Sequence, residues 1–203
     1  MIQIIAMLSM LIDHLGVLYE VQWFRVVGRL SMPLYAFLVA YSFGCTNDRK
    51  RYIKRLFTIS VLSQAFFCSA LRIEEFKLNV VFVWAFAVFW LDLYENKNKV
   101  LYILTPIYVL FVLAVNVDYG IIGFGWVLFW YFKYKEKLKS PYDTAILMML
   151  CFISPLQAFS IISYPLAVYC KKHNKVRCKN RLIKYIYRWF YPAHLALLTG
   201  LQC

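Results

Sequence analysis

The sequence predicts an all-α fold, a polytopic bundle of transmembrane helices. The chain has 203 residues, of which 63% are hydrophobic and only 16% are charged, and its mean hydropathy is +0.61. A soluble domain of this size needs a polar exterior that this composition cannot supply. Apolar runs recur every ~20 to 25 residues, which suits helices that cross a ~30 Å hydrocarbon core, whereas barrel strands would alternate polar and apolar positions. We expect one domain, residues 1–203.

The N-terminal segment is apolar from its first residues and predicts a first span that is retained. It lacks the basic region and the small-residue cleavage site of a signal peptide. The cysteines are scattered rather than spaced as a disulfide framework, so we expect free thiols. There are six of them: Cys45, Cys68, Cys151, Cys170, Cys178 and Cys203.

The first half of the chain predicts four spans. Three cover residues 2–19, 26–43 and 52–71, and the fourth begins at Asn79. A basic cluster immediately precedes the third span. By the positive-inside tendency this cluster is cytoplasmic, and the N-terminus then lies on the same side.

The second half predicts two further spans and a less regular region. Residues 100–117 form one span, a turn holding Asp118 follows, and the next span ends at Phe132. Residues 141–170, with Pro155 near their middle, are expected to form two short helices that meet at an outer turn.

The last span is predicted over residues 183–201, with the C-terminus outside. Reading 141–170 as two helices keeps the basic residues between 171 and 184 in the cytoplasm. The bundle therefore has about nine membrane helices, or eight if 141–170 is one span, and several of them are short or broken.

Ionisable residues in apolar segments are the candidate functional groups. A charge at the centre of a membrane helix costs about 2.5 to 3.5 kcal/mol on insertion scales, so such residues are functional by default. Asp13 and His14 lie in the first span and Arg29 lies in the second. With a helical rise of ~1.5 Å per residue, His14, Arg29, Asp118 and His194 share one depth band in the outer half of the bundle.

Helix geometry predicts the partners of these groups. Successive residues point ~100° apart, so Asp13 and His14 face different neighbours. We expect Asp13 to pair with Arg29, because a buried carboxylate without a cation would take up a proton. One of the two histidines, His14 or His194, then remains for a substrate, oriented by Asp118. A purely structural ion pair joining the first two spans is a compatible alternative.

The basic loops and the remaining motifs restrict the ligands and the classes of enzyme that fit the sequence. Basic clusters ordinarily fix orientation and contact anionic lipid, but Arg55, one turn after Arg51, is placed to hold a phosphate-bearing ligand at the inner mouth. Cys170, His173 and Cys178 are only three ligands among repelling cations, so no metal site is expected. The sequence lacks a phosphate-binding glycine loop, a GxSxG elbow and an HExxH pair, which argues against an ATPase, a serine hydrolase and a zinc protease. No nucleic-acid partner is expected.

A series of segments resembles the TraX family, which is associated with acetylation of conjugative pilin. The segments are IAMLSMLIDHLG, VVGRLSMPLYAFLVAYSF, CTNDRKRYIKRL, LNVVFVWAF, DYGIIGFG and YIYRWFYPAHLALL, and their order and spacing carry the resemblance. Met32 stands where the family often has an aromatic residue, and residues 141–179 match only in hydropathy. The family pattern falls on Asp13, His14, Gly28, Arg29, Pro33, Arg55, Asn79, Asp118, Tyr119, Gly120, Tyr191 and His194.

The resemblance implies a multi-pass transferase of the bacterial inner membrane that uses acetyl-CoA. Its acceptor would be the N-terminal amine of a pilin subunit or another amine. Either histidine suits the base, since imidazole titrates near neutral pH, and Arg29 suits the oxyanion or the ionised Asp13.

The position of the basic loops gives a hypothesis for the carrier site. We expect the CoA nucleotide at the inner basic loops around Arg51, Arg55 and Lys184, with the pantetheine arm reaching up to the histidines. Asn79, Tyr119 and Tyr191 would position ligands by hydrogen bonds. Transfer is direct or passes through an acetyl-histidine, and both routes stay open.

Two other classes of protein fit the residues. In a proton- or ion-coupled transporter, Asp13, His14, Asp118 and His194 would form a relay. In a non-catalytic factor, the bundle would only escort pilin within the lipid bilayer.

Overall fold

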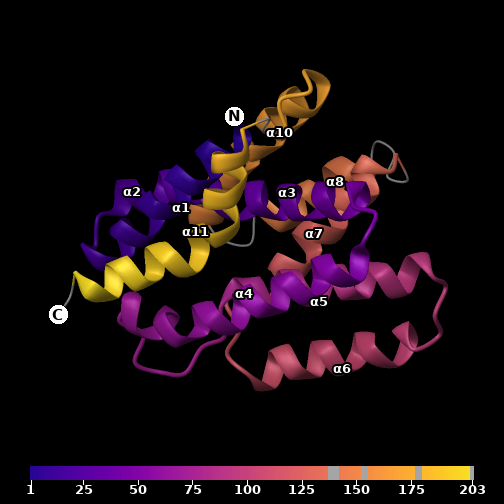
Figure 1. The fold of residues 1–203 in the computed structure, drawn as a ribbon, viewed down its shortest axis with the longest axis horizontal. Coiled ribbons are helices and arrows are strands. Elements are labelled where there is room, and N and C mark those ends of the chain that lie inside the picture. The colour runs from indigo at the N-terminus through magenta and orange to yellow at the C-terminus, as the bar shows by residue number, and fades with distance from the viewer. Residues whose placement is uncertain (137–141, 152–154, 177–179, 202–203) are drawn as a thin grey trace.

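The computed structural model describes residues 1–136, 142–151, 155–176 and 180–201. Within these ranges the chain is all-helical apart from its turns and one isolated parallel bridge between Leu78 and Val117. The prediction of an all-α fold is therefore confirmed. Figure 1 shows the helices as a bundle in which α3 lies among its neighbours and α6 lies along one edge.

The helices of the first half are α1 (Ile2–Leu18), α2 (Gln22–Gly28), α3 (Ser31–Cys45), α4 (Arg49–Ala70) and α5 (Val80–Glu95). The predicted second span, 26–43, is instead two helices, because the regular pattern is interrupted at Arg29 and Leu30, although both keep helix-like backbone angles. The third predicted span, 52–71, corresponds to α4, which begins earlier, within the basic cluster. The Asp48 side chain caps α4 because it accepts the Arg51 N–H at 2.9 Å.

The helices of the second half are α6 (Leu101–Ala114), α7 (Gly120–Tyr134), α8 (Tyr142–Cys151), α9 (Pro155–Ala158), a 3-10 turn (Phe159–Ile162), α10 (Ser163–Lys172) and α11 (Arg181–Gly200). Two short helices were predicted over residues 141–170, whereas the described residues form α8, α9, the 3-10 turn and α10. α9 starts at Pro155, a residue that suits a first helical position because it has no N–H to satisfy. Pro192 lies inside α11, which bends in Figure 1.

The core is built around α3. This helix is buried along most of its length and packs against α1, α5, α7 and α10, while α11 packs against α1 and α4. Gly28 lets α2 approach α1 closely, since a Cβ at this position would lie 2.3 Å from Asp13 Cβ. Four of the cysteines, Cys45, Cys68, Cys151 and Cys170, are free thiols, and Cys178 and Cys203 lie outside the described residues.

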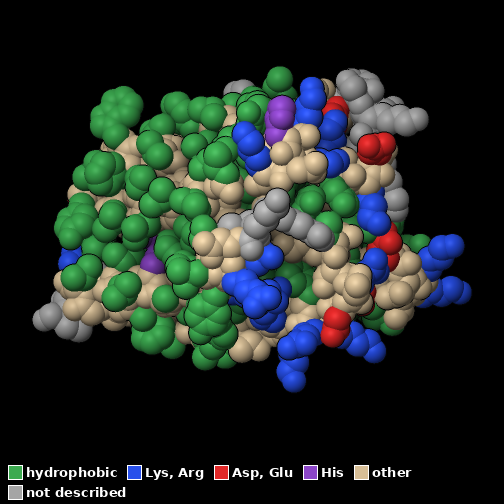
Figure 2. Space-filling model, turned by 45° about the horizontal axis from the view of Figure 1, so that its top comes forward, with side chains coloured by type: hydrophobic (Ala, Val, Ile, Leu, Met, Phe, Trp, Pro, Cys, Tyr) green, Lys and Arg blue, Asp and Glu red, His purple; other side chains and the backbone are tan. Residues whose placement is uncertain are grey.

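Contacts between loops and helix ends occur at both ends of the bundle. At one end Arg49 lies 3.7 Å from Asp92, and the Lys171 ammonium lies over the ring of Tyr134. At the other end the bridge between Leu78 and Val117 joins the loop after α4 to the loop after α6. Figure 2 shows hydrophobic side chains over one part of the surface and Lys and Arg gathered towards the opposite end.

Helix length alone identifies one candidate membrane span. Among the described residues, the stretch Gln22–Cys45 is long and apolar enough to cross a membrane, whereas α1 and α6 are apolar but shorter. The outer surface is nevertheless strongly apolar: on α6, Tyr102, Ile103, Leu110 and Leu113 are each more than half exposed. Exposed apolar surface of this extent marks contact with lipid or with another protein.

Candidate functional site

The ionisable residues of the first two helices line a cavity of about 370 Å³, which we call the histidine pocket. It is formed by α1, α2, the start of α3, the ends of α4 and α5 that adjoin it, the turn before α7, and α11. Its volume is in the range of small-ligand sites. Its polar lining residues are Asp13, His14, Arg25, Arg29, Ser31, Lys77, Asp118, Tyr119 and Tyr191.

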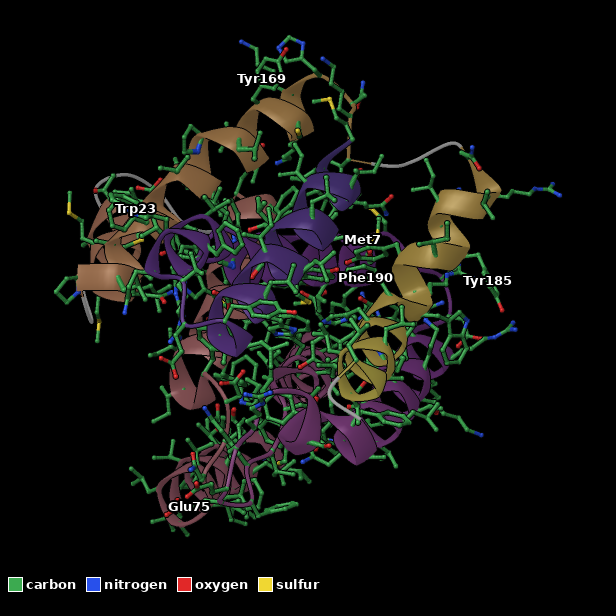
Figure 3. The ribbon with its side chains drawn as sticks, turned by 90° about the vertical axis from the view of Figure 1, so that its left-hand side faces the viewer. Met7, Trp23, Glu75, Tyr169, Tyr185 and Phe190 are labelled. Carbon is green, nitrogen blue, oxygen red and sulfur yellow. The ribbon has the colours of Figure 1, made fainter. Side chains whose placement is uncertain are left out.

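His14 and His194 meet at this pocket although they are 180 residues apart. His14 Nδ1 lies 2.8 Å from His194 Nε2, and the two ring planes are nearly parallel, at 15°, with their centroids 4.9 Å apart. His14 is only 8% exposed and His194 only 4%. His194 Nδ1 lies 2.7 Å from the carbonyl oxygen of Phe190. Figure 3 labels Phe190, which lies where α11 runs beside α1.

These contacts assign the tautomers of the neutral pair. A carbonyl oxygen can only accept, so His194 Nδ1 must carry a proton and donate it. His194 Nε2 then has a lone pair and accepts the Nδ1–H of His14. Consequently His14 Nε2 is the nitrogen with a free lone pair. His14 lines the histidine pocket, whereas His194 is absent from the described lining of the pockets and lies behind it.

Asp13 and Arg29 form the ion pair that helix geometry predicted. Arg29 Nη2 lies 3.7 Å from Asp13 Oδ1, and Arg29 Nη1 donates to the Tyr119 hydroxyl at 2.7 Å. Asp13 Oδ1 and Arg29 Nε are both buried and have no hydrogen-bond partner. Buried polar atoms are usually paired by hydrogen bonds, so these two atoms are exceptions.

Asp118 does not orient a histidine, contrary to the prediction. Its carboxylate lies 2.9 Å from the Lys77 ammonium, and the group that orients His194 is the Phe190 carbonyl. Burial raises the pKa of the Asp118 carboxyl, and the Lys77 charge opposes this shift. Lys77 was not identified from the sequence, because it belongs to a turn whose acids and bases balance.

Tyr119 is held in a strained backbone conformation. Its φ is 57°, in the left-handed region that bulky residues avoid at a cost of about 1 to 3 kcal/mol. Gly120, which follows it, has a φ of 30°. This turn places the Tyr119 hydroxyl on Arg29, and backbone strain of this kind clusters at functional sites.

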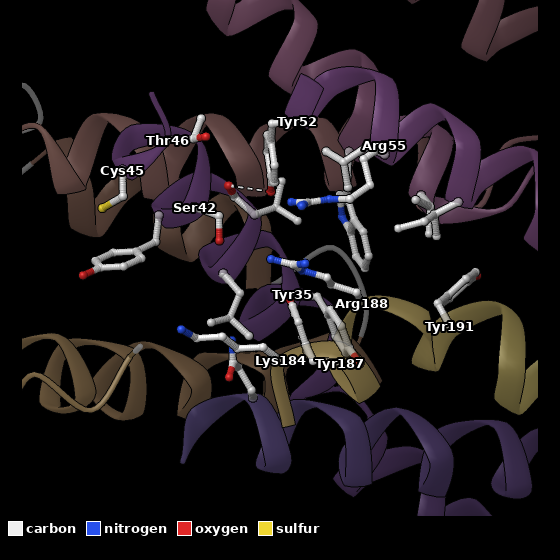
Figure 4. A pocket seen from close by; sticks show the side chains of 18 of the residues that line it. Tyr35, Ser42, Cys45, Thr46, Tyr52, Arg55, Lys184, Tyr187, Arg188 and Tyr191 are labelled. Carbon is white, nitrogen blue, oxygen red and sulfur yellow. Dashed lines mark hydrogen bonds between the residues drawn. The ribbon is translucent and has the colours of Figure 1, made fainter. Parts of the chain in front are cut away.

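A second cavity of about 380 Å³, which we call the basic pocket, lies between α3, α4 and α11. Arg55, Lys184 and Arg188 supply its positive charge, and Figure 4 shows both guanidinium groups within it. Among its described lining residues there is no aspartate or glutamate, and no described carboxylate lies within ion-pair distance of these three cations.

The two pockets adjoin, because Trp84 and Tyr191 line both. Tyr35 stands beside them in the basic pocket. Its ring stacks between Trp84 and Tyr187, with both centroid distances at 5.5 Å. Neither Trp84 nor Arg188 was identified from the sequence as a site residue. Arg188 follows Lys184 by one helical turn, and this spacing could have identified it.

Two predicted carrier residues lie elsewhere. Asn79 is fully buried, donates to the Ser60 carbonyl and to Gln64, and accepts the Val81 N–H as the cap of α5. It lines neither pocket, because its side chain is consumed in joining α4 to α5. Arg51 is exposed and also lines neither pocket, whereas Arg55, Lys184, Tyr119 and Tyr191 do line them. Among the described residues no group of three or more His, Cys, Asp or Glu could hold a metal ion.

Comparison with known proteins gives the family. The TraX protein family matches residues 1–202 of the chain. The chain belongs to the TraX family. A relative, the "Probable fimbrial assembly protein FimC, serogroup H1" of Dichelobacter nodosus, is 26% identical over 98% of this chain and 93% of its own length. No solved structure matches the chain. Family membership and the candidate span together indicate association with a membrane.

Proposed function

We propose that this TraX-family chain is a membrane-embedded acyltransferase that moves an acetyl group from acetyl-CoA to an amine of a pilin or fimbrial subunit. The observation that carries the proposal is the junction of two pockets. One holds uncompensated cations, and the other holds a buried imidazole with a free nitrogen. The name of the Dichelobacter relative, a fimbrial assembly protein, supports a pilin-like acceptor.

The basic pocket suits the phosphates of the carrier. Guanidinium groups bind phosphate oxygens in a bidentate way, and hydrogen bonds between ionised groups are roughly twice as strong as neutral ones. Arg55 and Arg188 provide two such groups from different helices, and Lys184 adds a third charge. Without an internal acid, these cations need an anion from outside.

The histidine pocket suits the transfer step. In this step the amine nitrogen bonds to the thioester carbon and His14 Nε2 takes the amine proton. The carbon–sulfur bond breaks, and the proton on His14 passes to the departing sulfur to give the thiol of CoA. Arg29 stabilises the oxyanion that forms on the carbonyl oxygen, with Asp13 balancing its charge and Tyr119 fixing its position. Attack by His14 Nε2 on the thioester would give an acetyl-histidine first.

The proposed topology is multi-pass in the bacterial inner membrane. The end of the bundle that gathers the cations faces the cytoplasm, as does the N-terminus, and the C-terminus faces outward. Acetyl-CoA then enters the basic pocket from the side where it is made, and the histidine pocket lies towards the outer side where a processed pilin subunit is found. The apolar side chains exposed on α6 contact lipid.

Reconstitution in proteoliposomes tests the proposal. The purified chain is given acetyl-CoA and a synthetic peptide with a free pilin-like N-terminus, and release of the CoA thiol and the mass of the peptide are followed. The proposal expects peptide-dependent thiol release. Ion flux without turnover would instead favour the transporter, and peptide binding with neither would favour the escort factor. Acetyl label retained on the protein without peptide would identify the acetyl-histidine route.

A further inference from the structure

The wall between the two pockets contains three polar atoms that have no partner. They are the Nε1 of Trp84 and the hydroxyl oxygens of Tyr35 and Tyr191. These residues are 3%, 5% and 5% exposed, and they come from three different helices, α5, α3 and α11. A buried donor or acceptor without a partner is rare in folded proteins and asks for an explanation.

The position of these atoms supplies the explanation. Trp84 and Tyr191 line both pockets, and Tyr35 lines the basic pocket in stacking contact with Trp84. Unpartnered indole nitrogens alone do not mark a site, since Trp126 and Trp130 also have them in the core and line neither pocket. Here one indole nitrogen and two hydroxyls without partners coincide at the boundary between the two pockets.

The charges on either side restrict the ligand. The basic pocket attracts an anion, and the histidine pocket surrounds a reactive group, but the wall itself carries aromatic rings and neutral donors. A segment that fits there is slender, uncharged and supplied with hydrogen-bonding groups. Each hydroxyl can donate or accept, and the indole can only donate, so carbonyl acceptors and N–H donors of amides match this set.

We propose that Tyr35, Trp84 and Tyr191 form a collar that binds a linear, amide-bearing segment joining the anionic part of the carrier to its reactive thioester. This inference rests on the proposed function, in which that segment is the pantetheine arm of acetyl-CoA. The stacked rings of Trp84, Tyr35 and Tyr187 give the collar a firm side. Tyr191, one turn after Tyr187 on α11, lines both pockets.

Binding measurements on whole protein in nanodiscs test the collar. The probes are CoA and 3′-phosphoadenosine 5′-diphosphate, which has the phosphates but no arm. We expect Tyr35→Phe, Trp84→Phe and Tyr191→Phe each to weaken CoA binding by about two- to tenfold, the range of a neutral hydrogen bond, and to leave binding of the armless nucleotide unchanged. Trp126→Phe is the matched control, a buried indole away from both pockets, and should change neither.

Thermal stability gives a second readout, which should rise in the variants whose CoA binding falls. Removing a hydroxyl that has no partner in the unliganded protein should raise the melting temperature of Tyr35→Phe and Tyr191→Phe while CoA binding falls. A hydroxyl with a purely structural role would lower the melting temperature instead, and that result would overturn the collar.

The outcomes separate the collar from the proposed function. If both probes bind the unmodified protein and the three variants weaken neither, or weaken both equally, the collar is wrong and the carrier site stands. If neither probe binds the unmodified protein, the proposed function fails and the collar fails with it.

Discussion

The two pockets are almost equal in volume but differ in how their charge is balanced. In the histidine pocket two of the three cations are paired, Arg29 with Asp13 and Lys77 with Asp118, and Arg25 has no ion pair among the described residues. In the basic pocket, the cations have no carboxylate among the described lining residues. Paired charges organise a site from within, whereas unpaired charges of one sign raise the local concentration of an oppositely charged ligand. In the proposed function, the histidine pocket carries out the chemistry and the basic pocket captures the carrier, and each prediction below tests that division.

The largest effect is expected at His14. His14→Ala should reduce acetyl transfer by about 10²- to 10⁴-fold, the contribution of a general base, and leave CoA affinity unchanged because the carrier binds in the other pocket. Turnover is measured by thiol release and affinity by titration. His173→Ala is the control, since His173 is exposed and lines neither pocket. Full activity of His14→Ala would show that His14 is not the base and would contradict the proposed roles of the two pockets.

The next effect is expected in the basic pocket. Arg55→Gln or Arg188→Gln should weaken CoA binding by about tenfold or more, because a hydrogen bond to a charged group contributes about 1.5 to 3 kcal/mol. Arg51→Gln is the matched control on the same helix: it removes the same charge one turn away, where the side chain is exposed and lines neither pocket. Equal losses of CoA affinity in Arg51→Gln and Arg55→Gln would show that affinity depends on the overall positive charge of this region and not on a contact within the pocket.

A smaller effect is expected at His194. This residue acts through His14, whose tautomer it fixes, so His194→Gln should lower turnover by up to about tenfold, the value of one neutral hydrogen bond. The pH dependence of turnover should shift as well, since the base loses its hydrogen-bonded neighbour. A loss as large as that of His14→Ala, with an unchanged pH profile, would contradict a positioning role.

The smallest effect concerns the pair of Lys77 and Asp118. Both side chains are partly exposed, so Lys77→Met should lower stability by about 1 kcal/mol or less at neutral pH. Burial raises the folded-state pKa of Asp118, so protonation of this residue favours the folded state and the loss should fade as the pH falls through that pKa. Melting temperatures of the variant and the parent across acid pH measure this, with Lys175→Met as an exposed control. A loss that grows towards acid pH would contradict the assignment.

The sequence predicted local features of the site better than distant ones. The ion pair of Asp13 and Arg29 was predicted because a buried carboxylate needs a cation to stay ionised, and helix phase separated Asp13 from His14. The contact between His14 and His194 was not predicted, because the position of a residue along its helix gives its depth in the bundle but not the direction in which its side chain points. Asn79 was misassigned for a physical reason: an asparagine before an apolar helix is also a cap, and the cap and the cross-links to α4 occupy its side chain. Arg51 and Arg55 share a helix face, but only the second is deep enough to line a pocket.

The hydrogen-bond chain from His14 through His194 ends at the main-chain oxygen of Phe190. A peptide oxygen has no proton to hand onward, so a proton captured at His14 cannot exit through the far side of the helix pair. It has to return to the cavity from which it came. In the proposed reaction the departing sulfur is there to receive it, and the base is restored within the same turnover. A protein built to carry protons across a bilayer would gain no continuous route from this arrangement.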